Sequence, residues 1–126
     1  MSVKFRSIKR KNLQDPTAPP KNYAIAHSQE VTDIDGLSAL ISDKSTISRP
    51  DVYAVIMALL ESIIKELEAG RAVQLGKLGT FSISVNSEGI DAAEEVTGAL
   101  IKKARVVYRP GMEIRDMLKV LKYEKS

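Results

Sequence analysis

The sequence predicts an α+β protein, with one domain over residues 31–126 and a basic, extended segment over residues 1–30 before it. Three observations support this class. Large aliphatic residues recur every three or four positions between residues 48 and 69, which is the period of an amphipathic helix. Apolar and polar residues alternate around the glycines of VQLGKLGTFSI at 73–83, which indicates strands joined by a tight turn. ARVVYRP at 104–110 has the composition of a further strand and leads into a final helical stretch.

The N-terminal segment contains two apolar stretches on either side of a proline-rich loop. VKFRSIKRKN precedes DPTAPP at 15–20, which holds three of the five prolines and interrupts regular structure. KNYAIAHS at 21–28 then predicts a short strand. Extended segments with apolar residues pair with a sheet edge, so we expect this segment to be ordered, with a disordered basic tail as the alternative. The side chains expected to be buried are those of Phe5, Ile8, Tyr23 and Ile25.

Two helices are predicted next. The first begins near Thr32, where Thr32 and Asp35 form a pattern like a capping box. The second begins at Ser48 with Pro50 in its first turn, where the missing N–H costs nothing, and it ends at Gly70.

The apolar stripe of the second helix is wide for so small a domain. Part of it must serve as intramolecular core, and the surplus predicts a dimer interface. With one residue from the following strand, the predicted interface residues are Val52, Val55, Ile56, Leu59, Leu60, Ile63 and Phe81.

The second half of the domain is predicted to contain a three-stranded antiparallel sheet and a last helix. Strands are expected near 72–75, 80–85 and 104–110, and a helix from Pro110 to about Leu121. Residues 86–103 form a long excursion between the second and third strands. Good helix formers at Ala92–Val96 predict a short helix within it.

Composition excludes several classes of function. Cysteine is absent and His27 is the single histidine. The residues that form zinc sites and histidine-dependent catalytic triads are therefore almost entirely missing. No phosphate-binding glycine loop or paired nucleophile and base is present, so we expect no enzyme, catalytic residue, metal, cofactor or small-molecule substrate. No apolar run approaches the length of a membrane span, and we expect a cytoplasmic protein that does not bind membranes.

Charge is unevenly distributed along the chain. Residues 1–30 carry a net charge of +4, residues 31–70 carry −4, and residues 71–126 carry +3. Two basic ends indicate an anionic partner, although solvated lysines produce similar patterns.

The order of these elements, together with two stretches of sequence, resembles the HU and integration host factor family of bacterial DNA-bending proteins. The stretches are ISRPDVYAVIMALLESIIKELEAGRAVQLGKLGTFSISV at 47–85 and VVYRPGMEIRDML at 106–118. The resemblance covers roughly residues 31–122, and the block at 1–30 is similar to an extension found in some HU-related proteins. It implies an HU-like fold in which two intertwined subunits form a saddle, with β-arms that enter the DNA minor groove.

The excursion at 86–103 departs from the family pattern. Family arms carry arginines where this sequence has Ser84 and Asn86, and they have an Arg-Asn-Pro tip, whereas no proline occurs here between residues 86 and 109. Residues 86–101 contain no basic residue and four acids, namely Glu88, Asp91, Glu94 and Glu95. Negative charge opposes phosphate contact, so the usual arm insertion is not expected.

The DNA contacts implied by the resemblance therefore fall on other residues. At strand spacing Lys103, Arg105 and Arg109 share one face. The full set of candidate DNA-binding residues is Lys103, Arg105, Arg109, Lys102, Arg115, Lys9, Arg10 and Lys11.

Two functional hypotheses remain open at this point. The first is a homodimeric, nucleoid-associated protein that binds double-stranded DNA without strong sequence preference. The second is an HU-fold protein-interaction or structural module with little DNA binding, which the acidic excursion favours. The sequence leaves a heterodimer with a related chain open as well.

Overall fold

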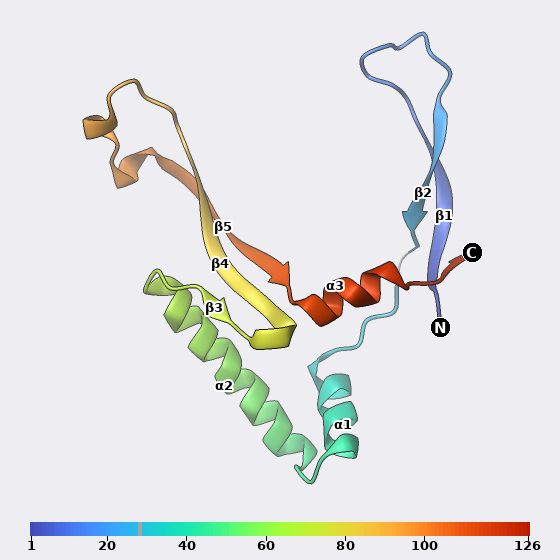
Figure 1. Ribbon diagram of the computed structural model, residues 1–126, viewed down its shortest axis with the longest axis vertical. Coiled ribbons are helices and arrows are strands. Elements are labelled where there is room, and N and C mark those ends of the chain that lie inside the picture. The colour runs from blue at the N-terminus through green and yellow to red at the C-terminus, as the bar shows by residue number, and fades with distance from the viewer. Residues whose placement is uncertain (28) are drawn as a thin grey trace.

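The α+β class predicted from the sequence is confirmed. The computed structural model describes residues 1–27 and 29–126, with every side chain in these ranges except that of Glu94. Two three-stranded sheets and three α-helices make up most of this part of the chain (Figure 1). The strands are β1 (Val3–Arg10), β2 (Lys21–Ala26), β3 (Val73–Gln74), β4 (Gly79–Ser87), β5 (Ile101–Pro110) and β6 (Tyr123–Lys125). The α-helices are α1 (Ile34–Lys44), α2 (Arg49–Glu68) and α3 (Met112–Lys119), and the 3₁₀ turns are η1 (Gly76–Leu78), η2 (Ala93–Glu95) and η3 (Gly98–Leu100).

The first two helices begin with side-chain caps. The sequence placed the start of α1 near Thr32, but Asp33 is the N-cap, because its carboxylate accepts a hydrogen bond of 2.9 Å from the backbone N–H of Gly36. Ser48 caps α2, and Pro50 lies in the first turn. Gly70 takes a left-handed conformation, with φ of +82°, directly after the helix.

The helix α2 leads through β3 into a tight turn that joins β3 to β4. Residue Gly79, at the end of this turn, has a φ of +131°, a region of backbone conformation that is essentially reserved for glycine. The Tyr108 hydroxyl donates a hydrogen bond of 2.7 Å to the carbonyl of Leu78, and the N–H of Gly111 donates to the same carbonyl at 3.2 Å. The turn is therefore held against the end of β5.

The strand β4 pairs with β5 in antiparallel register over most of its length. The pairing runs from Gly79 opposite Pro110 to Asn86 opposite Lys103, and a β-bulge follows between Asn86 and Ser87. Each strand is longer than the sequence predicted, since the pairing continues into the excursion. Beyond the bulge, the stretch expected to be helical at Ala92–Val96 forms only the 3₁₀ turn η2, because a stretch this short gains few hydrogen bonds for the cost of starting an α-helix.

The N-terminal segment forms a second sheet with the strand order β2-β1-β6. Antiparallel pairing joins β1 to β2, and β6 runs parallel to β1 with Val3 opposite Tyr123. The sequence analysis missed β6, since three residues without an apolar alternation carry no strand signal. The expected burial differs too: Phe5, Ile8 and Ile25 are half-buried, but Tyr23 is exposed, with the Arg10 guanidinium 6.0 Å from its ring centroid.

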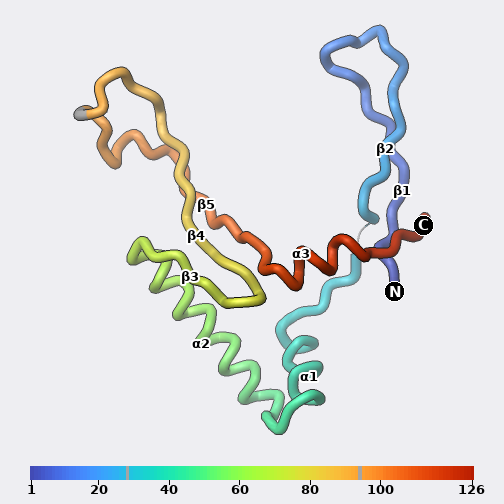
Figure 2. Tube along the Cα trace, viewed as in Figure 1, coloured from blue at the N-terminus to red at the C-terminus, as the bar shows by residue number. Residues whose placement is uncertain are grey.

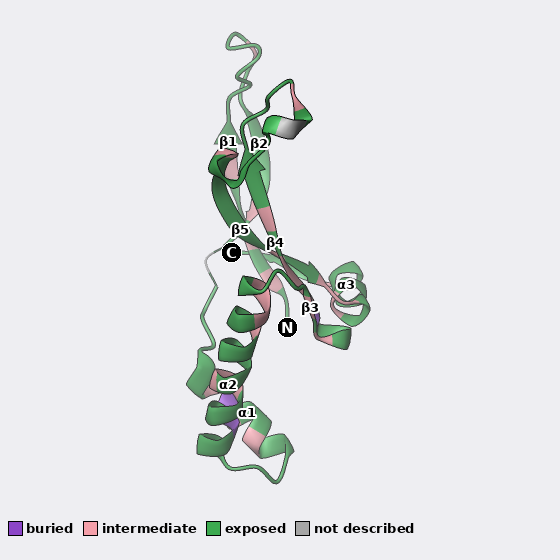
Figure 3. Cartoon of the chain, turned by 90° about the vertical axis from the view of Figure 1, so that its left-hand side faces the viewer, coloured by how far each residue is buried: buried purple, intermediate pink, exposed green. Residues whose placement is uncertain are grey.

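One chain closes almost no hydrophobic core. The helices α1 and α2 form one limb, and the β4–β5 and β1–β2 hairpins project as two separate limbs (Figures 1 and 2). Among the described residues, only Ser38, Val52 and Gly79 are buried; the first two lie on the α1–α2 pair, and Gly79 lies at the start of β4 (Figure 3). Large aliphatic side chains on α2, β4 and β5 are left exposed.

Gly79 provides a test of the turn. A Cβ added there would clash with the carbonyl oxygen of Arg109 and lie 2.9 Å from the Tyr108 ring. We expect Gly79→Ala to lower the free energy of unfolding by about 1–3 kcal/mol, measured by chemical denaturation at fixed protein concentration. Gly89→Ala is the control, because an added Cβ there meets no atom within 4 Å. Equal loss of stability in the two variants would contradict the role assigned to Gly79.

Candidate nucleic-acid interface

The β4–β5 hairpin has one basic face. Side chains alternate between the faces of a strand, so Lys103, Arg105 and Arg109 of β5 lie on the same face, as the sequence predicted from their spacing. All three are exposed. Among the described side chains none of the three forms an ion pair, which leaves their charges available to an external anion.

Polar residues of β4 lie beside these cations. In the register of the hairpin, Asn86 is opposite Lys103, Ser84 is opposite Arg105, and Thr80 is opposite Arg109. Directly opposite residues point to the same face of a sheet, so each cation has a hydroxyl or amide neighbour. In protein–DNA complexes, phosphates are contacted by Lys and Arg and by side chains with hydroxyl or amide groups.

Two other predicted DNA-binding residues are placed differently. The Nζ atom of Lys102 lies 2.7 Å from a carboxylate oxygen of Glu88, in an exposed ion pair beside the β-bulge. This ion pair holds the Lys102 ammonium group beside the acidic excursion. Arg115 is exposed on α3, outside the hairpin.

The tip of the β4–β5 hairpin is acidic, as the sequence indicated. Glu88, Asp91 and Glu95 are exposed there, and the side chain of the fourth predicted acid, Glu94, lies outside the described part of the structure. Lys102 balances one of these charges through its ion pair. The remaining negative charge lies at the far end of the hairpin, beyond the basic face.

The opposite face of the β4–β5 hairpin is apolar and open to solvent. Ile83, Val85, Val106 and Tyr108 all alternate onto this face and are exposed, Val106 by 58%. Phe81 is half-buried on the same face, with its ring centroid 5.1 Å from that of Tyr108. An exposed apolar sheet face is unfavourable in water and is typical of an interaction surface.

The predicted interface residues on α2 fall into three groups. Val55, Leu59 and Leu60 are exposed, Val55 by 64%. Ile56 and Ile63 are half-buried. Val52 is only 4% exposed within a single chain, where α1 and α2 meet, so it already belongs to the intramolecular core and has almost no surface to add to an interface.

The N-terminal cations are not brought next to the basic face of β5. Lys9 and Arg10 end β1 and Lys11 begins the loop after it, on a hairpin well separated from β4–β5 (Figure 1). Sequence reasoning missed Lys21, which lies directly opposite Arg10 in the β1–β2 register. Only the pairing of the two strands shows that these cations are neighbours.

Other kinds of site find little support in the described residues. No group of three or more His, Cys, Asp or Glu side chains among them could hold a metal ion. No helix in the described ranges is both long and apolar enough to span a bilayer.

Helices α1 and α2, the β3–β4–β5 sheet with its projecting hairpin, and α3 together define an HU-like protein. An HU–DNA cocrystal structure from Anabaena matches with a TM-score of 0.53 and 22% identity, covering 70% of this chain and 98% of that one. A candidate bacterial DNA-binding protein from Bacteroides vulgatus matches with a TM-score of 0.67 and 14% identity. That match covers 98% of this chain and only 48% of the other, so this chain spans about half the length of that protein.

A match between the amino-acid sequence and a family model identifies the family of this chain. The model of the HU-HIG family, described as an HU domain fused to wHTH, Ig, or glycine-rich motif, matches residues 1–125. The chain belongs to this family, which confirms the resemblance to HU proteins inferred from residues 47–85 and 106–118. A comparison with curated proteins found no match.

Proposed function

We propose that this chain is a DNA-binding protein that acts as a homodimer, contacts the phosphate backbone without selecting a base sequence, and associates with the nucleoid in the cytoplasm. The single observation that carries the proposal is the division of the β4–β5 hairpin into a basic face and an apolar face. Membership of the HU-HIG family and the HU-like fold support DNA as the anionic partner.

The apolar face is the reason for proposing a homodimer. Ile83, Val85 and Val106 are exposed on the sheet, and Val55 and Leu59 are exposed on α2. Burial of apolar surface stabilises by roughly 25 cal/mol per Å². A second copy presents the same apolar surface, as the self-complementary interface of a symmetric dimer requires.

The basic face is the reason for proposing sequence-tolerant binding. Lys103, Arg105 and Arg109 each have a small polar neighbour, and together they form a strip suited to phosphates. The hairpin tip contains no Lys, Arg or proline. It therefore lacks the side chains that could read bases or wedge between base steps. Arg115 and Lys102 are secondary contributors in this account.

The acidic tip favours a second candidate function, a protein-interaction or structural module on the same fold. Glu88, Asp91 and Glu95 are exposed and would repel a duplex laid along the hairpin. The two candidates differ in one measurable property, which is whether the dimer binds DNA at low salt.

The homodimer can be tested by sedimentation. At micromolar concentration the protein is expected to sediment at about twice the chain mass of 13.8 kDa. Val106→Asp should shift the mass toward that of a single chain, since it places a carboxylate on the apolar face. Ser82→Asp, on the opposite face of the same hairpin, is the control and should remain dimeric. A folded wild-type monomer would contradict the proposal.

DNA binding can be tested by titration at two salt concentrations on unrelated duplexes. If about five phosphates are neutralised per dimer, the slope of log K against log salt should be about −4 to −5. We expect Lys103→Ala/Arg105→Ala/Arg109→Ala to weaken binding to a similar degree on every duplex and to flatten this slope.

The charge-matched control for this titration is Lys44→Ala/Arg49→Ala/Lys65→Ala, which removes three cations from α1 and α2. This control should bind nearly as well as the wild type. Failure of the wild-type protein to bind linear and pre-bent DNA at low salt would refute the DNA-binding function and leave the interaction module.

A further inference from the structure

The β1–β2 hairpin is the most basic projection of the molecule. Residues 1–27 contain six Lys or Arg residues and one acid, Asp15, which leaves a net charge of +5. Among the described side chains none of these six cations forms an ion pair. Asp15 forms no ion pair with a described cation, and its carboxylate accepts hydrogen bonds from the N–H and hydroxyl of Thr17, at 3.2 and 2.6 Å.

Two of these cations repel each other in the folded chain. Arg10 of β1 is directly opposite Lys21 of β2 in the antiparallel register. Like charges at directly opposite positions of a sheet destabilise the pairing. The register therefore gathers positive charge at the base of the loop, and a bound anion would reduce the repulsion.

The loop that joins the strands holds its shape through its own hydrogen bonds. The Asn12 side chain accepts a bond of 3.0 Å from the N–H of Gln14, and the N–H of Ala18 donates to the carbonyl of Asp15 at 3.1 Å. Prolines at positions 16, 19 and 20 stiffen it further. A preformed loop loses little conformational entropy when it binds.

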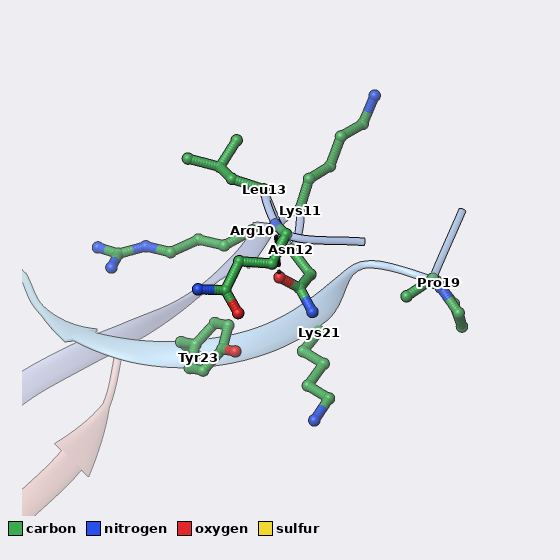
Figure 4. A pocket seen from close by; sticks show the side chains of 9 residues that line it. Arg10, Lys11, Asn12, Leu13, Pro19, Lys21 and Tyr23 are labelled. Atoms are coloured by element: carbon green, nitrogen blue, oxygen red, sulfur yellow. Dashed lines mark hydrogen bonds between the residues drawn. The ribbon is translucent and has the colours of Figure 1, made fainter. Parts of the chain in front are cut away.

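The cations of this hairpin point in different directions. Arg10 extends across the strand that carries Tyr23, while Lys11 and Lys21 point to opposite sides of the loop base (Figure 4). They border a shallow hollow of about 560 Å³ that Tyr23 also lines. Leu13, in the loop, is 93% exposed, so an apolar side chain is open to solvent beside these cations.

We propose that the β1–β2 hairpin is a DNA-binding arm, which enters the major groove of the duplex with Arg10, Lys11 and Lys21 on the flanking phosphates and Leu13 against the bases. This inference rests on the proposed DNA-binding function and adds a second contact, on an element other than β4–β5. The hairpin supplies the positive charge that the acidic tip of β4–β5 lacks.

Duplex DNA fits this hairpin for two physical reasons. A groove has phosphates along both of its walls, and Lys11 and Lys21, which point to opposite sides of the loop base, can reach both (Figure 4). The major groove is wide enough to admit a two-stranded β-ribbon. In that groove an apolar side chain such as that of Leu13 can lie against base edges and contact the methyl group of thymine.

The test compares two charge-matched variants on the same duplex at two salt concentrations. Arg10→Gln/Lys21→Gln should weaken binding at least about tenfold and flatten the salt slope by about 1–2. Lys44→Gln/Lys65→Gln removes the same charge from α1 and α2 and should bind like the wild type. Leu13→Ser should weaken binding with the salt slope unchanged, since Leu13 carries no charge.

Thermal melting and a charge-conserving swap separate a binding role from a structural one. Removal of the repelling pair should leave the Tm of Arg10→Gln/Lys21→Gln equal to or above that of the wild type. Arg10→Lys/Lys21→Arg should bind DNA as the wild type does. A lowered Tm with lost binding in both variants would overturn the inference and indicate a structural pair.

The two proposals fail in distinguishable ways. Wild-type protein that binds DNA, together with a hairpin variant that matches the α1–α2 control, would overturn the arm and leave the basic face of β5 as the site. Wild-type protein that binds no DNA at all would overturn both.

Discussion

The pairing register of β4 on β5 is the constraint on which the rest of the molecule depends. A slip of one residue would exchange the two faces of β4 relative to β5, and apolar and basic side chains would then share a face. The register is held at one end, where Gly79 fits under the backbone of Arg109 and the Tyr108 hydroxyl bonds to Leu78. The glycines of VQLGKLGTFSI therefore determine where the basic and apolar faces of the hairpin lie.

The chain presents two hairpins of opposite charge. The tip of β4–β5 carries exposed acids, whereas β1–β2 carries unpaired cations among the described side chains. The resemblance to HU proteins implies a DNA-binding arm at the place of the first hairpin, and the charge of this hairpin alone argues against DNA binding. The second hairpin can supply the missing positive charge, because DNA binding requires this charge on a projecting, preformed element and not on one particular strand pair.

Sequence reasoning predicted the elements with strong local signals and missed those that depend on distant pairing. The stripe of α2, the caps at its ends and the strands around Gly79 all follow from residue spacing. The strand β6 does not, because its residues become a strand only through pairing with β1, more than a hundred positions away. The proximity of Arg10 and Lys21 was hidden for the same reason, and Val52 was assigned to an interface because periodicity cannot distinguish the α1–α2 contact from a dimer contact.

The account is tested most directly by NMR chemical-shift mapping of the full-length protein during titration with a DNA duplex. We predict that two sets of resonances shift together as DNA is added: those of Lys103, Arg105 and Arg109, and those of the β1–β2 loop. The methyl resonances of Val85 and Val106 should stay in place, since the second copy covers that face. Shifts confined to the apolar face or to the acidic tip, or no shifts at low salt, would contradict it.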